Sequence, residues 1–160
     1  MKHLLFSLAL IAVTMLILSA CATKNETNDG ENNFRIKRGT NLSHWLSQNN
    51  EDRGEAREKH IQEDDFARLD SLGFDFVRIP IDEVQFWDEQ GNKLPEAWKL
   101  LTFALDQCGK HHLRAIVDLH IIRSHCFNAV NEDGANANTL FTSEKAQQDL
   151  INMWYQLSDE

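Results

Sequence analysis

The sequence predicts an α/β fold built on a parallel sheet, and three observations support this prediction. Three short runs rich in Val, Ile and Phe have the length and composition of strands that are buried on both faces. Helical patterns with one apolar face lie between these runs, so strand and helix alternate along the chain. Equivalent points recur about every 40 residues, at Asn41, Pro80 and His120.

The three predicted strands cover residues 34–41, 74–81 and 113–119. In the first, Phe34 and Ile36 alternate with polar residues before a Gly-Thr-Asn turn. The other two are short runs rich in Val, Ile, Phe and Leu, which is typical of strands in a parallel sheet.

The predicted helices begin and end at recognisable signals. The first spans residues 61–72, and Gly73 is its candidate C-cap. The second begins at Pro95, which suits a first helical turn, and Gly109 is expected to close it. The third begins at Thr142 or Ser143, both good N-caps. Its predicted apolar face carries Ala146, Leu150, Met153, Trp154 and Leu157.

The order β-α-β-α-β-α fits the start of a (β/α)8 TIM barrel. Such a barrel takes about 250 residues, so the chain from Phe34 onward has room for about the first three βα units. A flavodoxin-like or Rossmann domain is the rival fold. The turn at residues 39–42 lacks the G-x-G-x-x-G pattern, and no Walker-type phosphate loop occurs, which favours the barrel.

The N-terminus has the features of an export signal. Residues 4–18 are almost wholly apolar, which is the length of a signal-peptide core and short of the roughly 20 residues that span a bilayer. Leu18-Ser19-Ala20-Cys21 resembles the bacterial lipobox, so we expect a lipoprotein signal peptide over 1–20 and lipid on Cys21. The alternatives are an ordinary secretory signal or a signal anchor. Residues 21–33 are polar and are expected to be a flexible tether.

Charge and cysteine content limit the partners. The formal net charge is −9 and no basic run occurs, so nucleic acid is not an expected partner. Cys108 and Cys126 could pair in an exported protein, but Cys108 lies on an apolar helix stripe, where a buried thiol is the simpler interpretation. His120, His125 and Cys126 lack the spacing of a zinc site, so we expect neither a metal nor a cofactor.

Three segments together resemble glycoside hydrolase family 5, the cellulase-like family. They are Arg38-Gly39-Thr40-Asn41-Leu42-Ser43-His44-Trp45-Leu46, Leu72-Gly73-Phe74-Asp75-Phe76-Val77-Arg78-Ile79-Pro80-Ile81 and Ile116-Val117-Asp118-Leu119-His120. The resemblance covers residues 34–160 and implies a TIM barrel. It also implies a retaining glycosidase that acts on β-linked polysaccharide such as β-1,4-glucan.

The resemblance assigns roles to two residues near strand ends, where barrel active sites lie. Arg78 is implied to orient the nucleophilic carboxylate and keep it ionised. Its alternative role is a structural salt bridge with Asp82 or Asp118. His120 is implied to line the subsite at the scissile bond, and its alternative is a core histidine.

Further candidate substrate-binding residues follow the first and third strands. Asn41, His44 and Trp45 come after strand one, and Trp45 is either a sugar-stacking platform or part of the core. His125 lies in the polar segment 121–141, a long loop expected to wall the substrate cleft. This segment lacks the Pro-Gly pair that often follows the family histidine, which leaves the exact substrate open.

Neither catalytic carboxylate of the family is assigned on this chain. In the family, the acid/base and the nucleophile come from the ends of strands four and seven. The Asn-Glu pairs at 25–26, 50–51 and 131–132 lie in the tether or in loops. We therefore expect no turnover from this chain alone, whose last strand has an unpaired edge. A non-catalytic carbohydrate-binding lipoprotein and a small flavodoxin-like domain are the alternatives.

Overall fold

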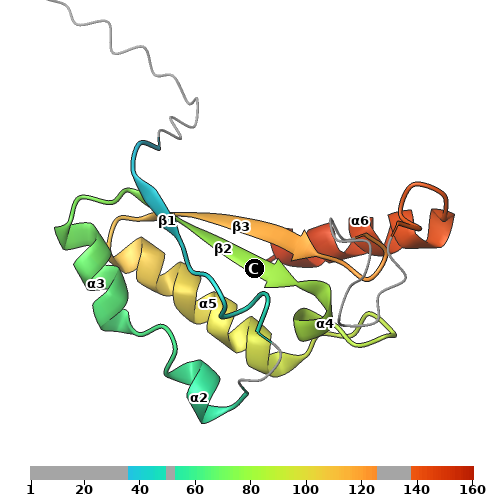
Figure 1. Ribbon diagram of the computed structural model, residues 1–160, viewed down its shortest axis with the longest axis horizontal. Helices are drawn as coiled ribbons and strands as arrows, with labels where there is room; N and C mark the ends of the chain where they lie inside the picture. The colour runs from blue at the N-terminus through green and yellow to red at the C-terminus, as the bar shows by residue number, and fades with distance from the viewer. Residues whose placement is uncertain (1–35, 50–52, 126–137) are drawn as a thin grey trace, which may run out of the picture. The chain divides into compact units, whose positions relative to one another are not determined.

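A computed structural model describes residues 36–49, 53–125 and 138–160, and these form a three-stranded parallel sheet with helices (Figure 1). The strand order is β1-β2-β3. The strands are β1 (Gly39–Asn41), β2 (Phe76–Asp82) and β3 (Arg114–Ile121), and the helices are α2 (Glu55–Glu58), α3 (Glu63–Ser71), α4 (Glu83–Phe86), α5 (Pro95–Lys110) and α6 (Glu144–Ser158). The predicted α/β class with parallel strands is confirmed.

The two faces of the sheet have different environments. Val77, Ile79 and Ile81 of β2 are completely buried and belong to the hydrophobic core. Figure 1 shows α3 and α5 on one side of the sheet. The two helices contact each other through aromatic side chains, because Phe66 of α3 packs edge-on against Phe103 of α5. The opposite face has no such helical layer among the described residues, and the polar side chains of the sheet lie there.

Helix α3 was predicted at 61–72 and runs from Glu63 to Ser71, so it begins two residues later than predicted and ends just before the predicted glycine. The Gln62 side chain and the Asp65 carboxylate form a capping box at the N-terminus, which satisfies N–H groups that have no helical partner. At the other end Gly73 has φ 75°. The Gly73 N–H donates to the Asp70 carbonyl and the Phe74 N–H donates to the Leu69 carbonyl, which is the Schellman pattern.

Helix α5 runs one residue past Gly109, so the prediction that Gly109 closes it is wrong. The residue in the left-handed conformation is instead His112, with φ 56°. The following Leu113 N–H donates to the Cys108 carbonyl at 2.9 Å, which closes the helix without a glycine. Cys108 is a free, buried cysteine, as the simpler of its two interpretations predicted.

Helix α6 begins after Ser143, whose hydroxyl accepts a hydrogen bond from the Ala146 N–H at 3.3 Å, so Ser143 rather than Thr142 is the N-cap. Ala146 and Met153 are buried as predicted. Trp154 was expected on the packed face but is 46% exposed, because it lies toward the side of the helix that also carries the exposed Tyr155.

Several predictions fall outside the described residues. They concern the signal peptide at 1–20, lipid on Cys21, the tether, Cys126 and most of the loop after β3. Within the described part of the chain, none of the helices is long and apolar enough to cross a membrane.

Candidate functional site

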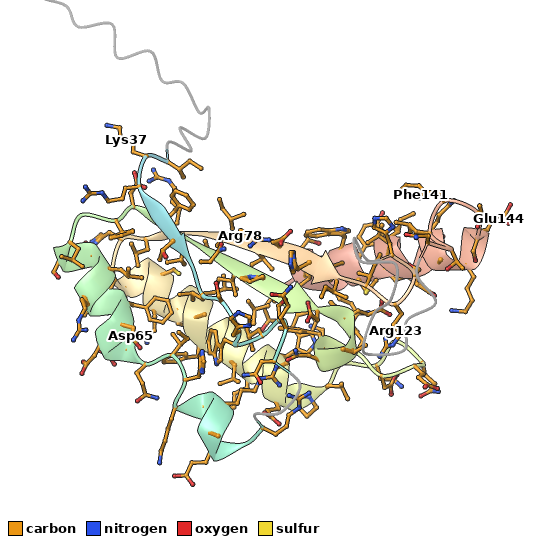
Figure 2. All side chains as sticks on the ribbon, in the orientation of Figure 1. Lys37, Asp65, Arg78, Arg123, Phe141 and Glu144 are labelled. Carbon is orange, nitrogen blue, oxygen red and sulfur yellow. The ribbon has the colours of Figure 1, made fainter. Side chains whose placement is uncertain are left out.

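Four polar side chains from the three strands meet on the sheet face opposite the helices. Asn41 of β1 lies opposite Arg78 of β2 in the strand register. Arg78 Nη1 donates to Asn41 Oδ1 at 3.2 Å, and Arg78 Nη2 contacts the Asp118 carboxylate of β3. His120 Nδ1 lies 3.1 Å from both Arg78 Nη2 and Asp118 Oδ2. Figure 2 shows Arg78 over the middle of the sheet.

The pairing of β2 with β3 is irregular next to His120. Ile81 pairs with Leu119 and the next residue, Asp82, pairs with Ile121, so the register of the two strands shifts by one residue beside His120. A bulge re-aims side chains and is frequent beside active sites. His120 lies two residues after Asp118, so the two side chains are on the same side of β3.

The cluster is partly withdrawn from water. The side chains of Arg78, Asp118 and His120 are 30%, 32% and 26% exposed. Ion pairs at this depth are less screened than fully exposed pairs, so the guanidinium is held in place by Asp118 on one side and by Asn41 on the other. Of the two carboxylates considered for Arg78, Asp118 makes the contact, whereas Asp82 is buried and accepts from the Gln48 N–H at 2.7 Å.

Trp45 lies outside the cluster. Its side chain is completely buried, and its Nε1 donates to the Arg57 carbonyl at 2.9 Å. Arg57 is itself buried, and its Nε donates back to the Trp45 carbonyl at 3.2 Å. Burial lowers the pKa of Arg57. An indole in this position offers no face to a sugar, so Trp45 belongs to the core and its prediction as a stacking platform is wrong.

The other predicted substrate residues have separate surroundings. His44 is exposed, with φ 53°, and its Nδ1 lies 3.4 Å from the Gln48 carbonyl oxygen. His125 is half-buried, and its ring lies edge-on to Phe141 with 5.3 Å between the ring centroids. The structure gives neither of them a contact with Arg78. Among the described residues, no group of three His, Cys, Asp or Glu side chains could hold a metal ion.

The sequence analysis missed a salt bridge between the segments that follow β2 and β3. Arg123 Nη1 and its backbone N–H donate to the two carboxylate oxygens of Glu83, each at 2.7 Å. Arg123 Nη2 donates to the Trp87 carbonyl at 2.7 Å. Figure 2 shows Arg123 beside α4. The one available signal was that opposite charges follow the ends of two neighbouring strands.

Comparisons with known proteins identify relatives of this chain. No family model matches the chain. Cellodextrinase A of Ruminococcus flavefaciens is 25% identical over 123 residues, which is 77% of this chain and 35% of the relative. Endoglucanase C of Acetivibrio thermocellus is 27% identical over 121 residues, which is 74% of this chain and 34% of the relative. The chain therefore spans about a third of the length of these curated relatives.

Solved structures show the same fold. A glycoside hydrolase family 5 enzyme of Prevotella bryantii superposes with a TM-score of 0.60 at 19% identity, over 78% of this chain and 37% of that structure. A broad-specificity family 5 endoglucanase from an uncultured bacterium gives a TM-score of 0.60 at 15% identity, over 78% and 35%. The described residues are thus an α/β unit with three parallel strands that matches about a third of a family 5 TIM barrel. The chain is related over that part to the glycoside hydrolase family 5 cellulases, as its motifs predicted.

Proposed function

We propose that the protein is a retaining glycoside hydrolase that acts on β-linked polysaccharide such as β-1,4-glucan, and that this chain forms one wall of its active site. The observation that supports the proposal is the cluster of Asn41, Arg78, Asp118 and His120 on one face of three parallel strands. The relatives named above are a cellodextrinase and endoglucanases, and one related enzyme has been solved with a xyloglucan tetradecasaccharide.

The cluster suits the chemistry of a retaining glycosidase. A retaining glycosidase uses two carboxyl groups about 5–5.5 Å apart, one as acid/base and one as nucleophile. A guanidinium is a cation with a rigid fork of donors, so Arg78 favours the ionised form of a nucleophilic carboxylate that lies beside it. Its contacts to Asn41 and Asp118 hold it in one orientation before substrate binds. His120 and Asn41 offer polar groups to sugar hydroxyls.

The test is an assay of the natural gene product, isolated from its own cells with an antibody against residues 36–160. We expect release of reducing sugar from β-glucan. Replacing Arg78 with Met should lower kcat/KM by about 100-fold or more, the usual effect of losing a positioned charge in an active site. Arg68→Met is the matched control, because Arg68 is an exposed arginine on α3.

Four results test the proposed function and the role of Arg78. A gene product that releases no sugar contradicts the proposal, and glucan binding without hydrolysis favours the carbohydrate-binding alternative. Equal activities of the Arg78 and Arg68 variants contradict the role of Arg78. The isolated 160-residue chain is expected to release no sugar, and any release from it would contradict the expectation that the catalytic carboxylates lie elsewhere.

We also propose that the protein is exported and held at a bacterial membrane, on its periplasmic or cell-surface face, by lipid on Cys21. The lipobox-like sequence Leu18-Ser19-Ala20-Cys21 supports this location. Cells fed a labelled fatty acid should incorporate it into the wild-type protein and not into Cys21→Ser, which should leave the membrane fraction. Label on the serine variant would contradict lipidation at this site.

A further inference from the structure

A pocket of about 410 Å³ lies between the turn that follows α4 and one side of α6. We propose that this pocket is a carbohydrate-binding site, separate from the cluster around Arg78, which holds one or two rings of a neutral sugar. Its volume is within the range of about 300–1,000 Å³ that is usual for small-molecule sites. The inference goes beyond the proposed function and does not depend on hydrolysis.

The pocket has two polar walls. One wall is a side of α6, formed by Lys145, Asp149, Asn152 and Gln156. Steps of four, three and four residues place these side chains on the same side of the helix. The other wall is the turn at 88–91. Trp87 Nε1 donates to Gln156 Oε1 at 2.9 Å, which joins the two walls.

The pocket and the cluster around Arg78 are on different sides of the sheet. Met153 lines the pocket and belongs to the same hydrophobic core as Val77 and Ile79 of β2. Successive side chains of a strand point to opposite faces, so Arg78 lies on the face away from this core. A ligand in the pocket would therefore not touch the cluster.

Two charged pairs in and beside the lining are already complete. Arg123 Nη1 donates to Glu83 Oε1 at 2.7 Å, and Lys145 Nζ lies 2.6 Å from Asp149 Oδ2. These four side chains are engaged with each other rather than with a ligand. Eight of the eleven lining residues have polar or charged side chains, so the pocket does not suit an apolar ligand.

The turn after α4 is held in one conformation by its own hydrogen bonds. Asp88 Oδ1 accepts from the N–H groups of Gln90 and Asn92, at 2.9 and 2.8 Å. The Gly91 N–H donates to the Asp88 carbonyl at 3.1 Å, and Gly91 has φ 80°, a conformation that glycine adopts easily. The turn that carries Glu89 and Gln90 is therefore fixed in advance, which lowers the entropic cost of binding.

Four polar groups of the lining have no hydrogen-bond partner among the described residues. They are the Glu89 carboxylate, the Gln90 side-chain amide, Asn152 Nδ2 and Gln156 Nε2. A carboxylate only accepts and an amide nitrogen only donates, whereas a sugar hydroxyl does both, so one sugar can satisfy both kinds. The Glu89 charge disfavours an anionic ligand, and no three described His, Cys, Asp or Glu side chains could hold a metal ion. A neutral sugar is the ligand that fits.

The test is a titration of the nitrogen-15-labelled 160-residue chain with cellobiose, followed by the indole N–H signal of Trp87. A Trp87→Phe variant identifies this signal among those of the four tryptophans. We expect the signal to move saturably with a Kd of about 1 mM, because a small ligand that forms a few hydrogen bonds in a polar pocket binds weakly.

Two variants remove groups that the sugar should contact. Glu89→Ala should raise the Kd by about tenfold and Asn152→Ala by about fivefold, because a hydrogen bond to a charged group contributes more. Gln148→Ala is the matched control. Gln148 Nε2 donates to Asn152 Oδ1 at 3.1 Å but does not line the pocket, so this variant removes the same hydrogen bond and should leave the Kd unchanged. Arg78→Met should also leave this Kd unchanged.

The backbone amide spectrum establishes that each variant is folded. A Trp87 signal that does not move at cellobiose concentrations well above the expected Kd overturns the inference. Unchanged Kd values in both Glu89→Ala and Asn152→Ala also overturn it, and so does loss of the Trp87 response in Arg78→Met, which would place the sugar at the cluster. A Gln148→Ala variant that weakens binding as much as Asn152→Ala overturns the role of Asn152. Because the titration involves no hydrolysis, a gene product that releases no sugar from glucan contradicts the proposed function alone.

Discussion

Replacing Arg123 with Met tests how strongly the segments after β2 and β3 are tied together. The change removes the Nη1 hydrogen bond to Glu83 and the Nη2 hydrogen bond to the Trp87 carbonyl, each 2.7 Å long. It leaves the Glu83 carboxylate, whose side chain is 13% exposed, with the backbone N–H of residue 123. Breaking a buried pair costs about 3–5 kcal/mol, and the 30% exposure of Arg123 lowers the expectation to about 2–4 kcal/mol.

The assay is urea unfolding followed by tryptophan fluorescence, with the free energy of unfolding taken from the linear extrapolation. Glu83→Gln combined with Arg123→Met should recover at least about 1 kcal/mol relative to Arg123→Met alone, because no buried charge is then left without its partner. The control is Lys145→Met, which breaks the exposed pair with Asp149 and should cost about 0.5 kcal/mol or less. Equal costs for the Arg123 and Lys145 variants would refute the reasoning.

Three further predictions concern the core, a buried thiol and the start of β1. Trp45→Phe should lower the free energy of unfolding by about 1–3 kcal/mol, because the Arg57 carbonyl loses its indole donor, and a cost below that of Trp154→Phe would contradict this. Burial raises the pKa of the Cys108 thiol from 9.0 to about 11. The folded state therefore holds the proton longer than the unfolded state, so stability should fall as pH rises from about 9 to about 11, and this fall should be smaller in Cys108→Ala. Two backbone N–H groups lower the pKa of Asp75, so its contribution is present above its unfolded pKa and is lost as pH falls through the folded value; NMR titration of an Asp75 that protonates at its ordinary pKa would contradict this.

The sequence was sufficient to predict the helices and strands that have a long, regular pattern of apolar residues. The apolar run of β2 was predicted at 74–81 and observed at Phe76–Asp82, and the start of α5 at Pro95 was predicted correctly. The four-residue helices α2 and α4 were missed because one turn is too short to show a helical period. The end of α5 was misplaced because His112 adopts the left-handed conformation that Gly109 was expected to supply.

The site was predictable in its residues but not in its contacts. Arg78, His120 and Asn41 follow from family motifs, and parallel strands bring them to one face of the sheet. The irregular pairing beside His120 and the bridge from Arg123 to Glu83 depend on register and side-chain packing between segments 40 residues apart. Periodicity carries no information on such contacts. For the same reason it did not decide whether the Trp45 indole points outward or into the core.

The strand register also has a consequence for the order of folding. Gly39 lies opposite Phe76 and Phe76 lies opposite Arg114, so the two strand pairings close loops of 37 and 38 residues. The entropy of loop closure grows only with the logarithm of loop length, so neither pairing has an entropic advantage. The order must then follow contact strength, and β2 pairs with β3 along its whole length whereas β1 has three residues. We therefore expect β2, α5 and β3 to form the nucleus, with β1 added afterwards.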